Sequence, residues 1–240
     1  MKLNADLGER VNGKLLGMDA ELMPLLDQAN IACGVHAGDE KTMRDTIRLA
    51  KQFGVEVGAH PSYPDPDNFG RTSMNLPRDE LIEVITSQVE TLCQKAEEEQ
   101  YPIQYVKPHG ALYNDMMADT KLFDTVLDAI KHCSKPLKLM LLANDQHAEF
   151  KALADRRGVE LIYEAFADRA YTDNGQLVSR SQDNAVHSAS DAISQVQLLV
   201  DVGQILSENS LPLTFPVDSI CVHGDNPEAL KVVQQIRALI

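Results

Sequence analysis

The stretch IACGVHAGDEKTMRDTIRLAKQFGVEVGA, residues 31–59, decides which fold the sequence predicts. Its first apolar run, Ile31–Val35, is typical of a buried strand. Apolar residues then recur at helical spacing, at Met43, Ile47 and Ala50. Gly54 is suited to end that helix, and a second apolar run, Val55–Ala59, follows directly. A strand, a helix and a strand in this order favour parallel pairing, because parallel neighbours need a crossover connection.

The same alternation extends over the whole chain. Further apolar runs predict strands at Met1–Asp6, Ile103–Val106, Leu137–Ala143, Val159–Phe166 and Ser219–Val222. Apolar residues at helical spacing predict helices that include residues 81–92, 122–130, 193–205 and 230–239. We see no linker that would divide the chain. Seven strand–helix units therefore predict one α/β domain over residues 1–240, a seven-stranded (β/α) barrel, with an open doubly wound sheet as the alternative.

Composition and charge exclude several classes of protein. The 240 residues are 44% hydrophobic, which is enough for one sizeable core. Lys and Arg number 22 and Asp and Glu number 36, so the net charge is −14. Such a chain lacks the basic surface of a nucleic-acid-binding protein and would be repelled by an anionic membrane. Its four cysteines form no CxxC pair, and no apolar stretch approaches the ~20 residues that span a bilayer, so we expect a cytoplasmic protein.

Polar residues follow nearly every predicted strand, and this placement is the main functional signal. In a barrel of this kind the carboxyl ends of the strands meet around one mouth, so these side chains are expected to share a pocket. The residues, in chain order, are Asp6, Glu9, Asn30, His36, Asp39, His60, Lys107, His109, Asn144, Asp145, Glu164, Asp168, Arg169, His223 and Asp225. The long loop from Pro61 to Pro77 is also expected to be functional.

Several of these residues have a simpler interpretation as helix caps. Asp39 precedes a predicted helix and is as well suited to cap it as to bind a ligand. Asp225, before Pro227, has the same two interpretations. Asn144 and Asp145 are better explained as caps than as catalytic residues.

Standard catalytic and nucleotide-binding motifs do not occur in the sequence. We find no GxxxxGK[ST], no GxGxxG after a strand, no HExxH and no GxSxG. The remaining groups are carboxylates, imidazoles, one lysine and a few arginines. That set favours hydrolysis by an activated water, with or without a metal ion.

Long blocks of the sequence resemble the LamB/YcsF family, whose bacterial members form the A subunit of an ATP-dependent 5-oxoprolinase. The blocks are LNADLGE (3–9), ANIACGVHAGD (29–39), VGAHPSYPD (57–65), FGR (69–71), YVKPHGALYN (105–114), EAFADRAY (164–171) and ICVHGDNP (220–227). The resemblance implies a seven-stranded barrel of the glycoside hydrolase/deacetylase type. It also implies conversion of 5-oxo-L-proline to L-glutamate with ATP hydrolysis, in company with partner subunits B and C.

The resemblance leads to a hypothesis for the role of each site residue. Asp6, with His60 or His109, is expected to activate the attacking water. Lys107 and Arg169 are expected to hold the substrate carboxylate or a phosphoryl group, and Glu164 or Asp168 to orient them or protonate the ring nitrogen. The remaining expected substrate-binding residues are Glu9, Asn30, His36, Asp39, Arg71, His223 and Asp225.

Metal dependence and oligomeric state stay open at this level. Deacetylases of the wider barrel superfamily hold a divalent ion with one Asp and two His, and Asp6, His60 and His109 occupy analogous places. We slightly favour acid–base chemistry without a metal. The alternative functions are a metal-dependent carbohydrate deacetylase or amidase and a non-catalytic, lactam-binding component of the enzyme. A homo-oligomer is compatible with the sequence.

Overall fold

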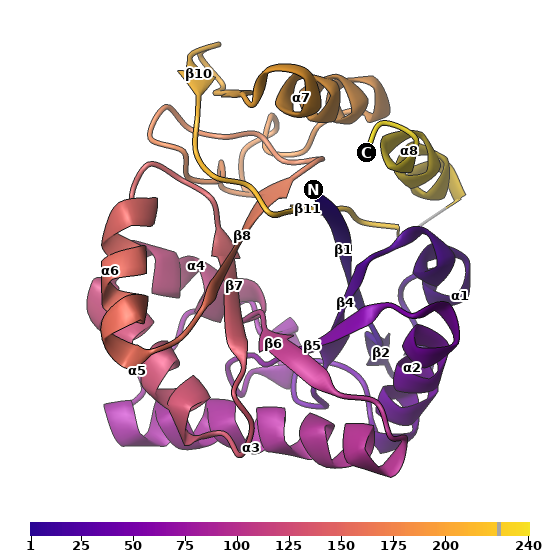
Figure 1. The fold of residues 1–240 in the computed structure, drawn as a ribbon, viewed down its shortest axis with the longest axis vertical. Helices are drawn as coiled ribbons and strands as arrows, with labels where there is room; N and C mark the ends of the chain where they lie inside the picture. The colour runs from indigo at the N-terminus through magenta and orange to yellow at the C-terminus, as the bar shows by residue number, and fades with distance from the viewer. Residues whose placement is uncertain (225–226) are drawn as a thin grey trace.

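A computed structural model describes residues 1–224 and 227–240, and in this part of the chain seven parallel strands close into a barrel. Their order around the barrel is β1, β11, β8, β7, β6, β5, β4 (Figure 1). The barrel prediction is confirmed, and the open doubly wound sheet is excluded by the closure. The strands are β1 (Lys2–Leu7), β4 (Gln28–Ala32), β5 (Glu56–His60), β6 (Ile103–Val106), β7 (Lys138–Leu142), β8 (Leu161–Phe166) and β11 (Ser219–Cys221).

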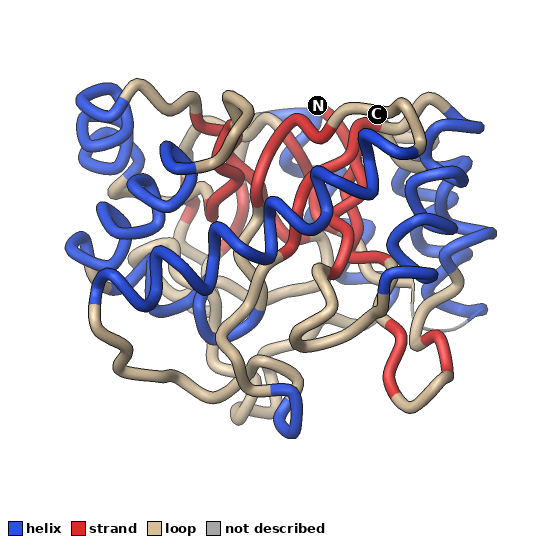
Figure 2. Tube along the Cα trace, turned by 90° about the horizontal axis from the view of Figure 1, so that it is seen from below, coloured by secondary structure: helices blue, strands red, loops and turns tan. Residues whose placement is uncertain are grey.

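Helices surround the barrel, as Figure 1 shows, and each connects one strand to the next. The longer helices are α2 (Glu40–Phe53), α3 (Arg78–Glu98), α4 (Gly110–Ala118), α5 (Thr120–His132), α6 (His147–Arg157), α7 (Ala189–Val202) and α8 (Pro227–Arg237). Figure 2 shows the strands at the centre, with most of the loops gathered below their carboxyl ends. None of the described helices is both long and apolar enough to cross a membrane.

Short elements decorate the rims of the barrel. Near the start of the chain are α1 (Asp19–Leu22) and the 3-10 turn η1 (Met23–Leu25), and the loop after β5 contains a second turn, η2 (Pro66–Asn68). Two small antiparallel hairpins complete the structure. They pair β2 (Arg10–Val11) with β3 (Lys14–Leu15) and β9 (Ile205–Leu206) with β10 (Pro212–Leu213).

Helix α2 shows how local sequence fixes an element. The Asp39 carboxylate accepts a hydrogen bond from Thr42 N at its first turn, and Gly54 ends the helix in the left-handed conformation. Its apolar face is buried against the barrel, including Met43 and Ile47. The periodicity in the sequence therefore predicts both the helix and the face that it buries.

Two predicted boundaries are wrong, for different reasons. The second strand runs over Gln28–Ala32 and not over Ile31–Val35, because its polar members Gln28 and Asn30 are buried inside the barrel and give no apolar signal. The long helix ends at Val202 rather than at Ile205. Gly203 takes the left-handed conformation there, and the chain turns into β9.

Candidate active site

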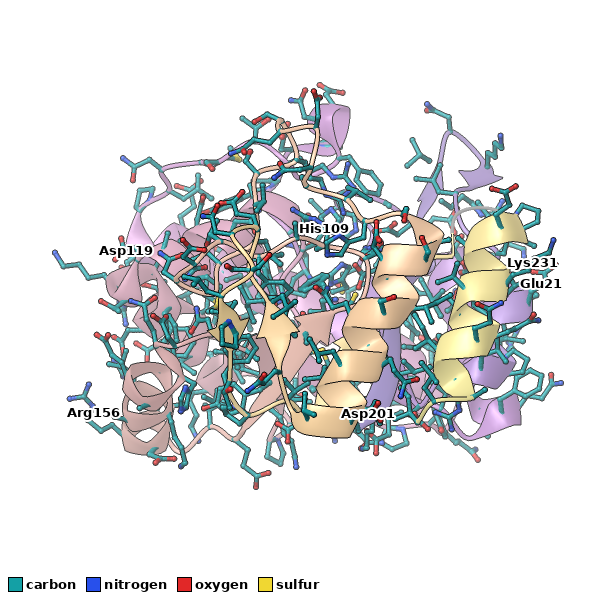
Figure 3. All side chains as sticks on the ribbon, turned by 90° about the horizontal axis from the view of Figure 1, so that it is seen from above. Glu21, His109, Asp119, Arg156, Asp201 and Lys231 are labelled. Atoms are coloured by element: carbon teal, nitrogen blue, oxygen red, sulfur yellow. The ribbon has the colours of Figure 1, made fainter. Side chains whose placement is uncertain are left out.

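The carboxyl ends of the strands bring most of the predicted site residues to one mouth. Asp6 lies near the end of β1, Asn30 in β4, His60 at the end of β5 and Glu164 in β8. Figure 3 labels His109 on the loop side of the barrel, and the labelled Arg156 and Asp201 lie towards the opposite end. The register pairs Asp6 with Asn30 across β1 and β4, so the two side chains share one face of the sheet.

The first group at this mouth is an ionic cluster, here called the Lys107 cluster, made of Asp6, Lys107 and Glu164. Lys107 Nζ lies 3.0 Å from Asp6 Oδ1 and 3.1 Å from Glu164 Oε2. Lys107 and Glu164 are buried. Burial alone would lower the pKa of Lys107, but the Asp6 carboxylate reverses this and the pKa lies well above its usual range. Lysine is therefore a permanent cation between two carboxyl groups.

Asp6 remains ionised in this setting. Burial alone would raise its pKa, but His60 and Lys107 outweigh burial and hold the pKa well below its usual range. Asn30 Nδ2 donates to Asp6 Oδ1 at 2.8 Å, so that oxygen has two donors. Asp6 Oδ2 lies 3.5 Å from His60 Nε2. One carboxylate oxygen is thus fixed by the cluster, and the other faces the histidines.

Three supporting residues of the Lys107 cluster were missed in the sequence. Tyr105 donates its hydroxyl to Asn30 Oδ1 at 2.6 Å, Asn4 Oδ1 accepts from Asn30 Nδ2 at 2.9 Å, and Cys221 Sγ lies 3.4 Å from Lys107 Nζ. A usable signal exists for the first two. Each stands two residues before a predicted site residue in the same strand, and side chains at that spacing point to the same face.

The second group, here called the histidine cluster, consists of Glu9, His36, His60 and His109. His109 Nδ1 lies 3.0 Å from His60 Nε2 and 3.6 Å from Glu9 Oε1. His36 Nε2 lies 3.4 Å from the same Glu9 oxygen, and the ring of His36 stacks on that of His109 with centroids 3.8 Å apart. The strand-end histidines that the sequence singled out thus meet, except for His223.

The predicted functional loop, residues 61–77, packs against the histidine cluster. His109 Nε2 lies 2.9 Å from the carbonyl oxygen of Phe69. Gly70 has a φ of +65°, and a Cβ there would come within 3.0 Å of Ser62 Cβ and 3.2 Å of both His36 and His109. Glycine at this position therefore allows the left-handed turn and the close contact with the rings.

Burial controls the charge of the histidine cluster. It lowers the pKa of His36 well below its usual range, and the charge of His60 adds to the effect. Burial also lowers the pKa of His109, to about 2, with further contributions from His60 and His36. Burial raises the pKa of Glu9, and the Asp6 carboxylate raises it further. His36 and His109 are therefore neutral imidazoles at neutral pH.

Asp168 and His223 form a separate ion pair on the β8 and β11 side of the mouth. His223 Nδ1 and Asp168 Oδ2 are 2.8 Å apart. Burial opposes charge on both groups, but their mutual attraction is stronger: the pKa of Asp168 is lowered and that of His223 is raised. This pair can present a protonated imidazole at the rim of the barrel.

Several predicted site residues lie apart from these groups. Asp39 caps α2, and the Arg71 guanidinium is exposed, 5.1 Å from the ring centroid of Phe69. Arg169 is buried, and its guanidinium donates to the carbonyl oxygens of Val178 and Ala185. Arg169 therefore anchors the loop that follows β8. Asp225 lies outside the described residues.

Asn144, expected as a helix cap, instead holds the turn before α6. Its side-chain oxygen accepts from Gln146 N at 3.0 Å, and Gln146 is the residue that precedes the helix. The cap expectation was therefore displaced by two residues.

Two sets of described side chains bring enough donor atoms together to hold a metal ion. One is the histidine cluster, and the other is Asp6, Cys221 and His223; within each set the ligand atoms lie within 4.8 Å of one another. His60 and His109, two of the three ligands expected from the sequence, fall in the first set. The third, Asp6, falls in the second.

Comparisons with known proteins agree along the whole chain. The LamB/YcsF family model matches residues 1–240. The 5-oxoprolinase A subunit of Vibrio cholerae serotype O1 is 45% identical over 241 residues, covering 100% of this chain and 97% of the relative. A 5-oxoprolinase A subunit of Pseudomonas aeruginosa, the one numbered 3, is 43% identical over 239 residues, covering 99% and 95%.

Solved structures extend the likeness to three dimensions. A lactam utilization protein from Thermus thermophilus has a TM-score of 0.90 and 32% identity, covering 100% of this chain and 95% of its own. A putative cellobiose-phosphate cleavage protein from Enterococcus faecalis has a TM-score of 0.51 and 13% identity, covering 96% and 83%. The second likeness shows a shared barrel fold.

Proposed function

We propose, from the premise that this chain belongs to the LamB/YcsF family, that it is the lactam-hydrolysing A subunit of an ATP-dependent 5-oxoprolinase. The reaction would open 5-oxo-L-proline to L-glutamate and consume ATP. The observation that carries the proposal is the buried contact of Asp6, Lys107 and Glu164 at the barrel mouth. It stands beside full-length similarity to proteins with that name.

The chemistry explains why ATP is needed. The lactam carbonyl is stabilised by amide resonance and is a poor electrophile. Phosphorylation of its oxygen gives a reactive imidate, which water can attack; the tetrahedral carbon then collapses and the ring nitrogen leaves with a proton. The sequence has no P-loop, so we assign the phosphorylation to partner subunits B and C and the ring opening to this chain. We place the reaction in the cytoplasm.

Each step has a candidate group in this chain. Asp6 is ionised, and its Oδ2 faces His60, so this pair is suited to orient the attacking water and accept its proton. Lys107 provides the positive charge that an anionic substrate or intermediate needs inside an acidic protein. The Asp168–His223 pair supplies a proton donor for the ring nitrogen. We assign Arg169 the positioning of its loop, because its guanidinium is bound to carbonyl oxygens.

Reconstitution with both partner subunits tests the proposal. We expect glutamate formation from 5-oxoproline that requires ATP and all three subunits. The substitution Asp6→Asn should lower the turnover rate by about 10²–10⁴-fold, the usual contribution of a positioned acid or base. Asp45→Asn on the exposed side of α2 is a matched control and should not change the rate.

Two other outcomes would contradict the proposal. Release of acetate from an acetylated amino sugar by the isolated chain would indicate a carbohydrate deacetylase. Tight lactam binding without turnover in any mixture of subunits would indicate a non-catalytic binding component.

A further inference from the structure

The hydrogen bonds of His60 and His109 fix which ring nitrogens carry protons. His60 Nδ1 lies 2.6 Å from the carbonyl oxygen of Lys107, and His109 Nε2 lies 2.9 Å from that of Phe69. A carbonyl oxygen only accepts hydrogen bonds, so both of these nitrogens must be protonated. In neutral rings the other two nitrogens, His60 Nε2 and His109 Nδ1, are then unprotonated.

Those two unprotonated nitrogens face each other at 3.0 Å. Two lone pairs at this distance repel each other unless a cation lies between them or one ring becomes an imidazolium. Burial strongly opposes the second solution at His109, because it lowers the pKa of that ring. The geometry therefore calls for a cation that accepts both lone pairs.

Glu9 supplies a third donor to the same point. Its Oε1 is buried, lies 3.6 Å from His109 Nδ1 and has no hydrogen-bond partner among the described residues. Around a tetrahedral ion with bonds of roughly 2.0–2.1 Å, neighbouring ligand atoms are about 3.3 Å apart. The observed separations of 3.0 and 3.6 Å bracket that value.

We infer that Glu9, His60 and His109 form a binding site for one divalent transition-metal ion. Two imidazoles and a carboxylate suit zinc and its neighbours in the first transition row, and three protein ligands leave a coordination position open. The backbone carbonyl bonds of His60 and His109 are the outer contacts that orient metal-binding histidines elsewhere. Such an ion supplies Lewis acidity to a bound water or carbonyl, and its use in lactam opening rests on the proposed function.

His36 has a different place in this site. Its ring plane is within 3° of that of His109, so the lone pairs of the two rings lie in separate parallel planes and do not aim at one point. Both His36 nitrogens are buried and have no hydrogen-bond partner among residues 1–224 and 227–240. We assign His36 to a group bound at the open position of the ion.

The second donor set, Asp6, Cys221 and His223, is a weaker candidate for a metal. Lys107 Nζ already lies within 3.4 Å of both Asp6 Oδ1 and Cys221 Sγ, so a cation is built into that set. Burial raises the pKa of Cys221 well above its usual range, which keeps the thiol protonated.

Metal titration of the isolated, chelator-stripped chain tests the inference without lactam, ATP or partners. We expect one equivalent of Zn²⁺ by calorimetry and one equivalent of Co²⁺ with visible absorption bands. Glu9→Gln, His60→Asn and His109→Asn should each weaken binding by at least about 100-fold, and His36→Asn by about 10–100-fold, as outer contacts of a metal do. Glu21→Gln and His132→Asn, both exposed, are matched controls and should bind as the original chain does.

Nitrogen-15 spectra of the histidine rings give a second measurement that does not depend on variants. Zn²⁺ should shift His60 Nε2 and His109 Nδ1, and it should leave His132, His147 and His187 unchanged. Spectra with a doubly protonated ring in the pair and no response to Zn²⁺ would overturn the inference. Uptake that the three ligand substitutions leave unchanged would also overturn it. Either result would leave the lactam reaction to be judged by reconstitution alone.

Discussion

The Lys107 cluster and the histidine cluster solve the same electrostatic problem in opposite ways. Both are buried at the carboxyl ends of the strands, and they meet where Asp6 Oδ2 lies 3.5 Å from His60 Nε2. The Lys107 cluster contains its own cation between two carboxyl groups. The histidine cluster contains a carboxyl group and facing lone pairs, so its cation must come from outside the chain. One half of the mouth is therefore complete on folding, and the other depends on its surroundings.

Removal of the internal cation should have the largest effect on stability. Lys107→Met leaves Asp6 and Glu164 buried without their partner, and breaking a buried pair in this way costs about 3–5 kcal/mol. Urea unfolding of the variant measures the loss. The double variant Lys107→Met, Glu164→Gln removes one of the two carboxylates and should recover part of the stability. A loss in the single variant below about 1 kcal/mol, typical of an exposed pair, would refute this view of the cluster.

A backbone change beside the rings should affect the histidine cluster alone. Gly70→Ala places a side chain on a left-handed residue against His36 and His109. We expect a loss of about 1–2 kcal/mol in the free energy of unfolding and weaker Zn²⁺ binding. Gly13→Ala is a control with the same sign of φ and nothing within 4 Å of the added Cβ. Equal Zn²⁺ affinity in the Gly70 variant and the control would separate this glycine from the site.

Asp39 lies outside both clusters and should act through its helix. Asp39→Ala removes the side-chain acceptor of Thr42 N, and loss of such a cap costs about 1 kcal/mol. Turnover in the reconstituted enzyme should be unchanged, whereas Asp39→Asn keeps the cap and should unfold as the original chain does. A loss of turnover with normal stability would return Asp39 to the substrate-binding residues.

The Asp168–His223 pair should give the smallest effect, and one that depends on pH. The pKa of His223 is raised from 6.5, so its contribution is present below that value and is lost as the pH rises through the folded pKa. The pKa of Asp168 is lowered from 3.8, so its contribution is present above that value and is lost as the pH falls through the folded pKa.

The two contributions coincide between roughly pH 4 and 6.5. In that window Asp168→Asn should be less stable than the original chain, by up to about 1 kcal/mol for a partly exposed pair. Asp6 and Lys107 also act on His223 and are unchanged in the variant. Thermal unfolding as a function of pH measures the difference, and a difference that grows above pH 8 would have the wrong sign.

The sequence predicts the barrel well because burial and periodicity are local properties. Each strand and long helix carries its own apolar pattern, so the count and order of units can be predicted without coordinates. Strand β4 shows the limit. Its buried Gln28 and Asn30 face polar partners contributed by other strands, and such pairing is invisible in a local pattern.

The candidate site was predicted as a set of residues, but not as two clusters. Position at strand ends identified Asp6, His60 and Lys107 from the general geometry of a barrel. Which of them touch depends on register and side-chain rotation between distant segments, and the same holds for Arg169, whose partners lie in its own loop. The proton positions of His60 and His109 depend on two backbone carbonyls, so only coordinates could reveal them.

The seam between β1 and β11 gives the molecule an order of assembly. Lys2 pairs with Ser219, and Asn4 Nδ2 donates to Ser219 Oγ, so the first strand made by the ribosome waits for the last. Until then β1 and β8 have open edges that can pair with other chains. A nascent chain interrupted before residue 219 would thus be prone to aggregate and would lack half of its hydrolytic pocket.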